Sequence, residues 1–139
     1  TPARLAALAV LTALTVGGCQ GGDEFASEGS SGSPMALTLP VVARESQVGP
    51  SPSASYYSVS TVSVGTPYSI SMTELQDDAD INVYSDASYN TLFCSGLARD
   101  KTAAESCSAS VPTNATYTAL YLKVKSYSQN GTSYRLTVQ

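Results

Sequence analysis

Asp77-Asp78-Ala79-Asp80-Ile81-Asn82-Val83-Tyr84 is the stretch around which the rest of the chain is organised. Three carboxylates crowd its first half, and aspartates are frequent in turns and in calcium-binding loops. Its second half alternates, with Ile81 and Val83 on one face and polar or aromatic residues on the other. Strict alternation of this kind predicts a half-buried β-strand. The stretch therefore predicts an acidic turn that leads into a core strand.

Alternating segments recur on both sides of this stretch, which predicts an all-β fold, an antiparallel β-sandwich of jelly-roll type. Between Tyr56 and Val64 the alternation changes parity near Ser60, which predicts a bulge or bend. Asn130-Gly131 is the preferred dipeptide of a two-residue type I′ turn and predicts a tight hairpin. Residues 85–110 are expected to be rich in loops, with a helical turn near 102–105. The other alternating strands are expected at Tyr68, Ile70 and Met72, at Leu120, Leu122 and Val124, and at Tyr134, Leu136 and Val138.

Composition excludes two classes of function. The 139 residues include seven Lys and Arg against eleven Asp and Glu, for a net charge of -4, and the basic residues are scattered. Nucleic-acid binding needs a clustered basic face, so no nucleic-acid partner is expected. The chain contains no His. Serine or cysteine nucleophiles therefore lack their usual base, and we expect a protein that is not an enzyme.

The first residues have the pattern of an export signal. An apolar run from Leu5 to Val16 is too short to span a bilayer, and it ends in Val16-Gly17-Gly18-Cys19. This ending resembles a bacterial lipobox, which implies a signal peptide over residues 1–18 and lipidation of Cys19. The alternative is an ordinary signal peptide with an incidental cysteine. The expected location is the bacterial cell surface or outer membrane through a lipid anchor alone, or the extracellular space.

Cysteine counting agrees with the lipobox. Three cysteines leave one unpaired in an exported chain, and assigning Cys19 to lipid leaves Cys94 and Cys107. Export places this pair in an oxidising compartment, where disulfides persist. We therefore predict a disulfide between Cys94 and Cys107.

Three segments follow the signal. Residues 19–34 are rich in Gly, Ser and acidic residues and are predicted to form a flexible tether. Residues 35–48 form an N-terminal strand segment, in which Pro40 restricts the strand to an edge or terminal position. Residues 49–139 form the sandwich. The segment could pack as the first strand of its own sandwich, or Leu37, Leu39 and Val41 could insert into a neighbouring copy and build a filament.

Several motifs together resemble the bacterial pre-peptidase C-terminal domain, which includes the collagen-binding modules of clostridial collagenases. The resemblance spans roughly residues 43 to 139. It implies a jelly-roll sandwich of the kind appended to secreted proteases, although here Ile81-Asn82 stands where the family has Leu-Tyr. The motifs are Tyr57-Ser58-Val59, Val64-Gly65, Tyr68-Ser69-Ile70, residues 78–84, Cys94 with Cys107, residues 120–124 and residues 134–138.

The acidic turn is a candidate calcium site. Asp77, Asp78 and Asp80, with Glu45 from the N-terminal segment, offer the hard oxygen ligands that Ca²⁺ prefers. The family resemblance implies the same pairing, because some relatives bind calcium between this turn and their N-terminal segment. The alternative is that these aspartates only form a turn.

Tyrosines are the remaining candidates for binding. Tyr84, Tyr121 and Tyr127 are expected on the strand face opposite the apolar one, where aromatic rings can stack on sugars or anchor a protein. The alternative is that they are strand-forming residues without a ligand. Two functions follow: a calcium-stabilised structural or adhesive lipoprotein that assembles with itself, or a monomeric surface module that binds a polysaccharide or a collagen-like protein.

Overall fold

The computed structural model describes residues 25–139, so the predicted signal peptide and Cys19 lie outside the described residues. No helix in the described part of the chain has the length and apolar character needed to cross a membrane. The described residues form nine β-strands: β1 (Met35–Leu37), β2 (Val41–Val48), β3 (Ala54–Ser60), β4 (Pro67–Thr73), β5 (Ala79–Tyr84), β6 (Leu92–Gly96), β7 (Glu105–Ser110), β8 (Ala119–Ser126) and β9 (Thr132–Val138).

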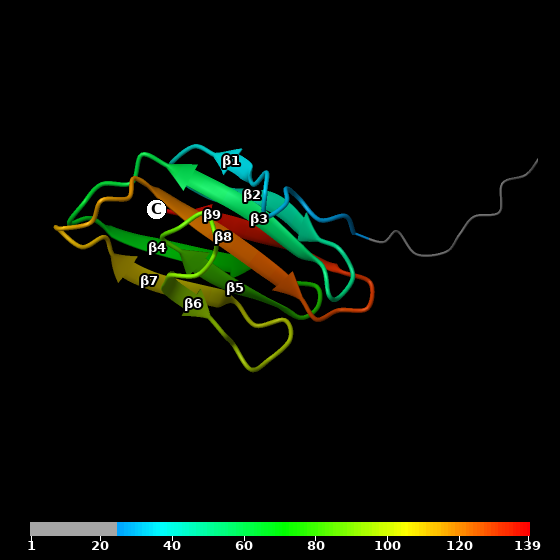
Figure 1. The fold of residues 1–139 in the computed structure, drawn as a ribbon. Coiled ribbons are helices and arrows are strands. Elements are labelled where there is room, and N and C mark those ends of the chain that lie inside the picture. Colours follow the sequence, from blue (N-terminus) through cyan, green and yellow to red (C-terminus); the bar gives the residue numbers. More distant parts are fainter. Residues whose placement is uncertain (1–24) are drawn as a thin grey trace, which may run out of the picture.

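The strands form two sheets that pack face to face (Figure 1). One sheet has five strands in the order β1-β3-β8-β5-β6, and the other has four in the order β2-β9-β4-β7. The strand pairs are antiparallel except for β1, which runs parallel to β3. The predicted antiparallel β-sandwich is confirmed.

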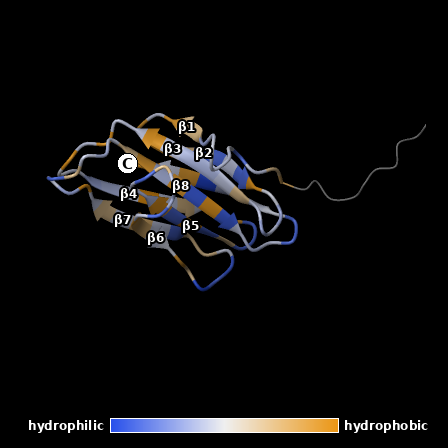
Figure 2. Ribbon diagram, in the orientation of Figure 1, coloured by the Kyte–Doolittle hydropathy of each residue, from blue (hydrophilic) through white to orange (hydrophobic). Residues whose placement is uncertain are grey.

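Alternation along each strand decides which side chains enter the core. Side chains of successive strand residues point to opposite faces, so every second residue faces the other sheet. Figure 2 shows the resulting hydrophobic and hydrophilic bands along β8. Burial of each large apolar side chain contributes about 2 kcal/mol to stability. The fully buried large side chains are Tyr57, Ile70, Met72, Ile81, Leu120, Leu122, Leu136, Val48, Val59, Val83, Val111 and Val124.

The N-terminal clasp, which we define as residues 25–37, closes one open side of the sandwich. The Glu28 carbonyl accepts a hydrogen bond from Tyr56 N–H (2.8 Å), and β1 continues along the same edge of β3. On the other sheet, the Ser27 hydroxyl accepts the Gly49 N–H (3.1 Å). The composition predicted a flexible tether over residues 19–34, whereas the structure places residues 25–34 against the sandwich. Specific side-chain contacts, which composition does not reveal, hold this polar segment in place.

Glu28 is the centre of these contacts. Its carboxylate accepts two hydrogen bonds from the Arg44 guanidinium (3.0 and 3.2 Å), one from the Tyr57 hydroxyl (2.5 Å) and one from Gln47 N–H (3.2 Å). The Tyr57 hydroxyl also bonds to the buried Tyr134 hydroxyl (2.6 Å), which carries the network into the core. Burial alone would raise the pKa of Glu28, but the hydrogen bonds from Arg44, Tyr57 and Gln47 lower it. The charged carboxylate therefore joins the clasp to both sheets.

The Cys94–Cys107 disulfide closes the opposite side. It joins β6 at the edge of one sheet to β7 at the edge of the other, with Cα atoms 5.7 Å apart. Nearby, the buried Glu105 carboxylate accepts the Ala98 N–H (2.7 Å), while its second oxygen has no partner among the described residues. Burial raises the pKa of Glu105, and the charges of nearby aspartates act in the same direction. The cysteine count thus identified the pair that links the two sheets.

The region between residues 85 and 110 differs from its prediction. It contains two strands, β6 and β7, and the predicted helical turn near 102–105 is wrong, because Glu105 begins β7. The sequence of β7, Glu-Ser-Cys-Ser-Ala-Ser, has too few apolar residues to be recognised as a strand. Pairing with β4 and the disulfide supply the stabilisation that this pattern lacks.

The predicted Asn130-Gly131 hairpin is also wrong. Strands β8 and β9 lie in different sheets, so the connection crosses the edge of the sandwich and does not join neighbouring strands. Gly131 has a φ of 79°, and a Cβ atom there would collide with the carbonyl oxygen of Val48. The glycine is needed for this close approach between backbones. A dipeptide preference cannot distinguish a hairpin from such a crossing.

The N-terminal strand segment is divided between the sheets. β1 ends at Leu37, and β2 begins at Val41 on the other side of Pro40. Leu37 and Val41 are buried in the core of their own chain, and Leu39 packs against it. Of the two placements that the sequence left open, this structure has the segment in its own sandwich. The predicted bend near Ser60 is present, since β3 ends at Ser60 and Thr61 has a positive φ of 63°.

Candidate functional site

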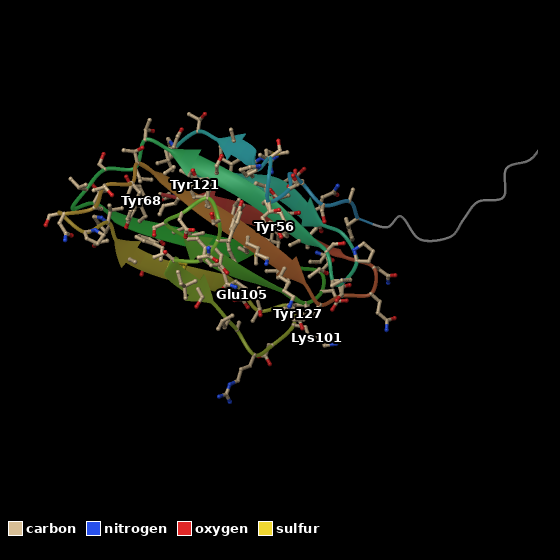
Figure 3. All side chains as sticks on the ribbon, in the orientation of Figure 1. Tyr56, Tyr68, Lys101, Glu105, Tyr121 and Tyr127 are labelled. Atoms are coloured by element: carbon tan, nitrogen blue, oxygen red, sulfur yellow. A yellow bond between two sulfur atoms is a disulfide. The ribbon has the colours of Figure 1, made fainter. Side chains whose placement is uncertain are left out.

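Four tyrosines form a cluster on the outer face of the five-stranded sheet, and we call it the tyrosine surface: Tyr56, Tyr84, Tyr89 and Tyr121. Tyr56 of β3, Tyr84 of β5 and Tyr121 of β8 point outward because their neighbours in the chain point into the core. Tyr84 and Tyr121 are directly paired across the two strands. Figure 3 shows Tyr56 and Tyr121 on this face. The sheet therefore presents aromatic rings from three adjacent strands.

Tyr89 is the centre of the cluster. Its ring centroid lies 5.1 Å from that of Tyr56, 5.5 Å from that of Tyr84 and 6.1 Å from that of Tyr121, each in an edge-to-face arrangement. Such pairs contribute about 1 kcal/mol each beyond their buried area. Burial raises the pKa of Tyr89 to about 12, and its hydroxyl has no partner among residues 25–139. Tyr89 therefore joins the other three rings into one cluster.

The loop before β6 holds Tyr89 in this position. The Asp86 carboxylate accepts hydrogen bonds from Asn90 N–H (3.1 Å) and Thr91 N–H (2.6 Å), which closes the loop. These backbone hydrogen bonds lower the pKa of Asp86. Tyr89 has a φ of 56°, an uncommon conformation for a bulky residue. An uncommon backbone conformation that the surroundings maintain is typical of functional loops.

Two lysines of β8 lie on the same face. The Lys123 ammonium is 5.8 Å from the Tyr56 ring centroid, and the Lys125 ammonium is 5.0 Å from that of Tyr127. Lys125 is paired across the strands with Asp80. Burial raises the pKa of Asp80, and the charge of Lys125 opposes this effect. Cationic and aromatic groups thus share one surface.

The sequence identified part of this surface. Of the predicted tyrosines, Tyr84 and Tyr121 come together, whereas Tyr127 lies beyond the end of β8, 47% exposed, and contacts Lys125. Tyr56 and Tyr89 were missed. The parity of β3 could have indicated Tyr56, since its neighbour in the chain, Tyr57, faces the core. Tyr89 lies in a loop, where no periodicity predicts direction.

The predicted calcium ligands are not assembled in the structure. Asp77 forms a turn, with its carboxylate accepting Asp78 N–H (2.8 Å), and Asp80 lies on β5. Glu45 lies on β2 in the other sheet, where it pairs with Arg135 (3.4 Å). No three acidic, His or Cys side chains among residues 25–139 lie close enough to hold a metal ion as they are arranged. Calcium binding stays a prediction.

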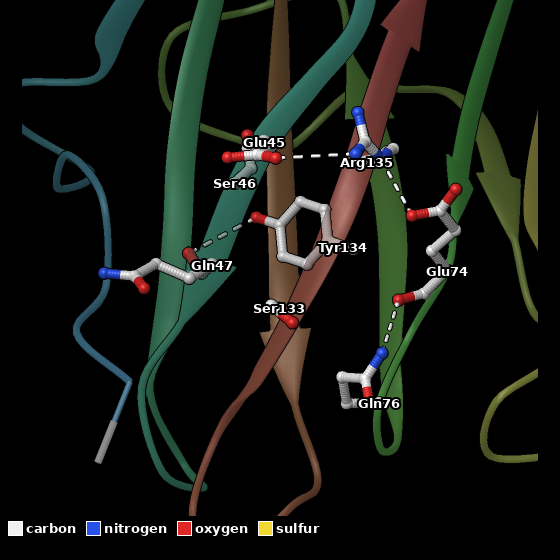
Figure 4. A pocket seen from close by; sticks show the side chains of 8 residues that line it. All are labelled: Glu45, Ser46, Gln47, Glu74, Gln76, Ser133, Tyr134 and Arg135. Atoms are coloured by element: carbon white, nitrogen blue, oxygen red, sulfur yellow. Dashed lines mark hydrogen bonds and ion pairs between the residues drawn. The ribbon is translucent and has the colours of Figure 1, made fainter. Parts of the chain in front are cut away.

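A polar pocket of about 340 Å³ lies on the outer face of the four-stranded sheet (Figure 4). Arg135 lies in it and donates to Glu74 (2.8 Å) and to Glu45 (3.4 Å). Both carboxylates are largely exposed, and exposed ion pairs of this kind contribute little to stability. The guanidinium already pairs with these two carboxylates, and the one aromatic residue that lines the pocket, Tyr134, is buried. The tyrosine surface is the stronger candidate.

Comparison with known proteins supports the architecture. No family model and no curated protein matches the chain. Among solved structures, the chain is similar to the pre-peptidase C-terminal domain of a collagenase from Bacillus anthracis, with a TM-score of 0.60 and 14% sequence identity. The match covers 77% of this chain and 95% of that domain. The two share a fold, as the sequence motifs implied.

Proposed function

We propose that this chain is a non-catalytic binding module that holds an extracellular polymer, a polysaccharide or a protein, against its tyrosine surface. The observation that carries the proposal is the set of three strand tyrosines packed around Tyr89 on one face of the sheet. Aromatic side chains on a rigid element supply contact area with little loss of conformational entropy on binding. The similarity in fold to a domain of a collagenase supports an extracellular role, since collagen is an extracellular protein. The predicted lipid at Cys19 would anchor the module to the cell.

Removal of a ring from the tyrosine surface is expected to weaken binding. Tyr84→Ala and Tyr121→Ala should each reduce the affinity for the bound polymer by about tenfold, because each removes an aromatic contact and loosens its neighbours. The measurement is isothermal titration calorimetry against a panel of soluble polysaccharides and collagen. Leu97→Ala serves as the control, since Leu97 is 63% exposed, follows the end of β6 and belongs to none of the ring pairs. Equal affinity of all three variants and wild type for every bound polymer would contradict the proposal.

Calcium is a second part of the proposal. Asp78 lies directly before β5 and Asp80 on it, and burial together with the charge of Asp78 raises the pKa of Asp80. Two neighbouring carboxylates are the hard oxygen ligands that Ca²⁺ prefers. Bound calcium stabilises the folded state, so the melting temperature should rise with calcium concentration. Differential scanning calorimetry in calcium, magnesium and chelator measures this, with Asp80→Asn as the variant that should lose the response. Identical melting curves in calcium and in chelator for wild type would exclude the site.

Self-association through Leu37, Leu39 and Val41 is a second candidate function. β1 is an edge strand of only three residues, and the exposed Val42 follows it at the start of β2. Exchange of such a segment between copies would preserve its contacts, as in domain swapping. Deletion of residues 35–42 tests this by size-exclusion chromatography and circular dichroism. A folded monomer that no longer assembles supports self-association. A wild-type chain that elutes as a monomer at every protein concentration contradicts it.

A further inference from the structure

The tyrosine surface carries two lysines that have no carboxylate of the described residues within salt-bridge distance. The protein has a net charge of -4, yet the central strand of its aromatic face carries Lys123 and Lys125. Among residues 25–139, Arg44 and Arg135 form ion pairs with carboxylates, whereas Lys123 and Lys125 form none within salt-bridge distance. Within this part of the chain Arg99 and Lys101 also form none, but they lie on an exposed loop and not on this face. The ammonium groups of Lys123 and Lys125 are therefore open to a ligand, although Asp80, which lies opposite Lys125 across the strands, offsets part of the Lys125 charge.

The register of the strands places the lysines beside the rings. Tyr121 lies between Ser58 of β3 and Tyr84 of β5, which forms one row across the sheet. In the next row Lys123 lies between Tyr56 and Asn82. Rows on one face of a strand are about 7 Å apart. A ligand that lies on the rings is thus within reach of an ammonium group and of the Asn82 amide.

The composition of this face favours a polysaccharide over a protein. The cores of protein interfaces are depleted in charged residues, and lysine is among the residues that interfaces avoid. Here lysine, asparagine and serine lie between the rings on the three central strands. Sugars offer apolar C–H faces to aromatic rings and hydroxyl groups to such polar neighbours. The unpaired ammonium groups add a preference for negative charge.

We propose that the tyrosine surface binds an anionic polysaccharide, one whose sugar rings carry carboxylates, with Lys123 and Lys125 contacting the carboxylates. This inference rests on the proposed function and adds the class of ligand. Tyr56, Tyr84 and Tyr121 contact the sugar rings. The ammonium groups select charged chains over neutral chains of the same sugar.

The test compares polygalacturonate with fully methyl-esterified polygalacturonate, which has the same backbone without the charge. Wild type should bind polygalacturonate more tightly, and the preference should shrink as salt rises. The double variant Lys123→Gln/Lys125→Gln should lose affinity for polygalacturonate by about fivefold and bind the ester as wild type does. Arg99→Gln/Lys101→Gln is the matched control, because it removes the same charge from an exposed loop. Thermal melting verifies that each variant is folded.

The outcomes separate the two proposals. Equal affinity of wild type for both polymers, with loss on Tyr121→Ala, overturns the charge inference and supports the binding function. If wild type binds collagen but neither polymer, and Tyr121→Ala loses that binding, the charge inference is overturned. The binding function is then supported with a protein as its ligand. Equal losses in the two double variants indicate an effect of net charge and overturn the role of Lys123 and Lys125. Absence of binding to both polymers and to collagen overturns the inference and leaves the proposed function without its ligand.

Discussion

Replacement of both Cys94 and Cys107 by alanine is expected to lower the free energy of unfolding by about 3 kcal/mol. The two residues are separated by 13 positions, and the bond restricts the unfolded chain by closing that loop. In the folded protein the bond joins the outer strands of the two sheets, and β7 has few apolar residues of its own to hold it there. Urea unfolding measures the loss, which corresponds to a fall of about 10 °C in melting temperature.

Reduction of the wild-type protein provides an independent control. Reductant should shift the wild-type urea midpoint toward that of the double variant and leave the variant unchanged. Mass spectrometry should find no free thiol at Cys94 or Cys107 in protein from an oxidising compartment. A wild-type midpoint that does not respond to reductant would show that the bond does not stabilise the sandwich.

Glu28→Gln is expected to destabilise the protein by about 2 kcal/mol, because the amide has one acceptor oxygen in place of two and no negative charge to pair with Arg44. The Glu28 side chain is only 17% exposed, so water can replace few of the hydrogen bonds that the variant loses. The variant also leaves the Arg44 guanidinium without its carboxylate partner. Loss of these contacts should release the clasp, which hydrogen exchange of the amides in residues 25–37 would detect. Chemical denaturation gives the change in stability.

The contacts of the Glu28 carboxylate predict that the stability of the protein depends on pH. The pKa of Glu28 in the folded protein lies below its ordinary value of 4.5. The folded state therefore releases this proton at a pH where the unfolded chain still holds it. The stabilisation is complete above pH 4.5 and is lost as the pH falls through the folded pKa. The difference in stability between wild type and Glu28→Gln should accordingly shrink in acid.

Glu45→Gln is the matched control, because Glu45 also pairs with an arginine but is 85% exposed. This variant should change stability by less than about 0.5 kcal/mol. Equal effects of Glu28→Gln and Glu45→Gln would contradict the role of the clasp. Unchanged hydrogen exchange of the amides in residues 25–37 of the Glu28→Gln variant would also contradict the role of the clasp.

Strand alternation allowed much of the sandwich to be predicted. Where every second residue is large and apolar, as at Ile81 and Val83 or at Leu120 and Leu122, both the strand and its buried face follow from the pattern. The pattern does not specify partners, which is why β8 and β9 were expected to form a hairpin. Their actual partners depend on how two sheets pack, and that is a property of the whole chain.

The contacts that close the two sides of the sandwich were only half predicted. The cysteine pair has a chemical signal in the sequence, whereas Glu28 lies in a polar segment that resembles a linker. Its position depends on Arg44 and Tyr57, which are 16 and 29 residues away. Tyr89 was missed for a similar reason, since a loop conformation brings it to the ring cluster. Side chains fixed by long-range contacts leave no local pattern.

The most direct test of the central claim is amide chemical-shift mapping of the ¹⁵N-labelled protein during titration with the polymer that calorimetry identifies. The account predicts that the largest shifts occur in β3, β5 and β8 and in the loop at residues 85–91, around the four tyrosines. Residues that line the Arg135 pocket on the opposite sheet should remain unchanged. Shifts confined to that pocket, or to the clasp at residues 25–37, would contradict the assignment of binding to the tyrosine surface.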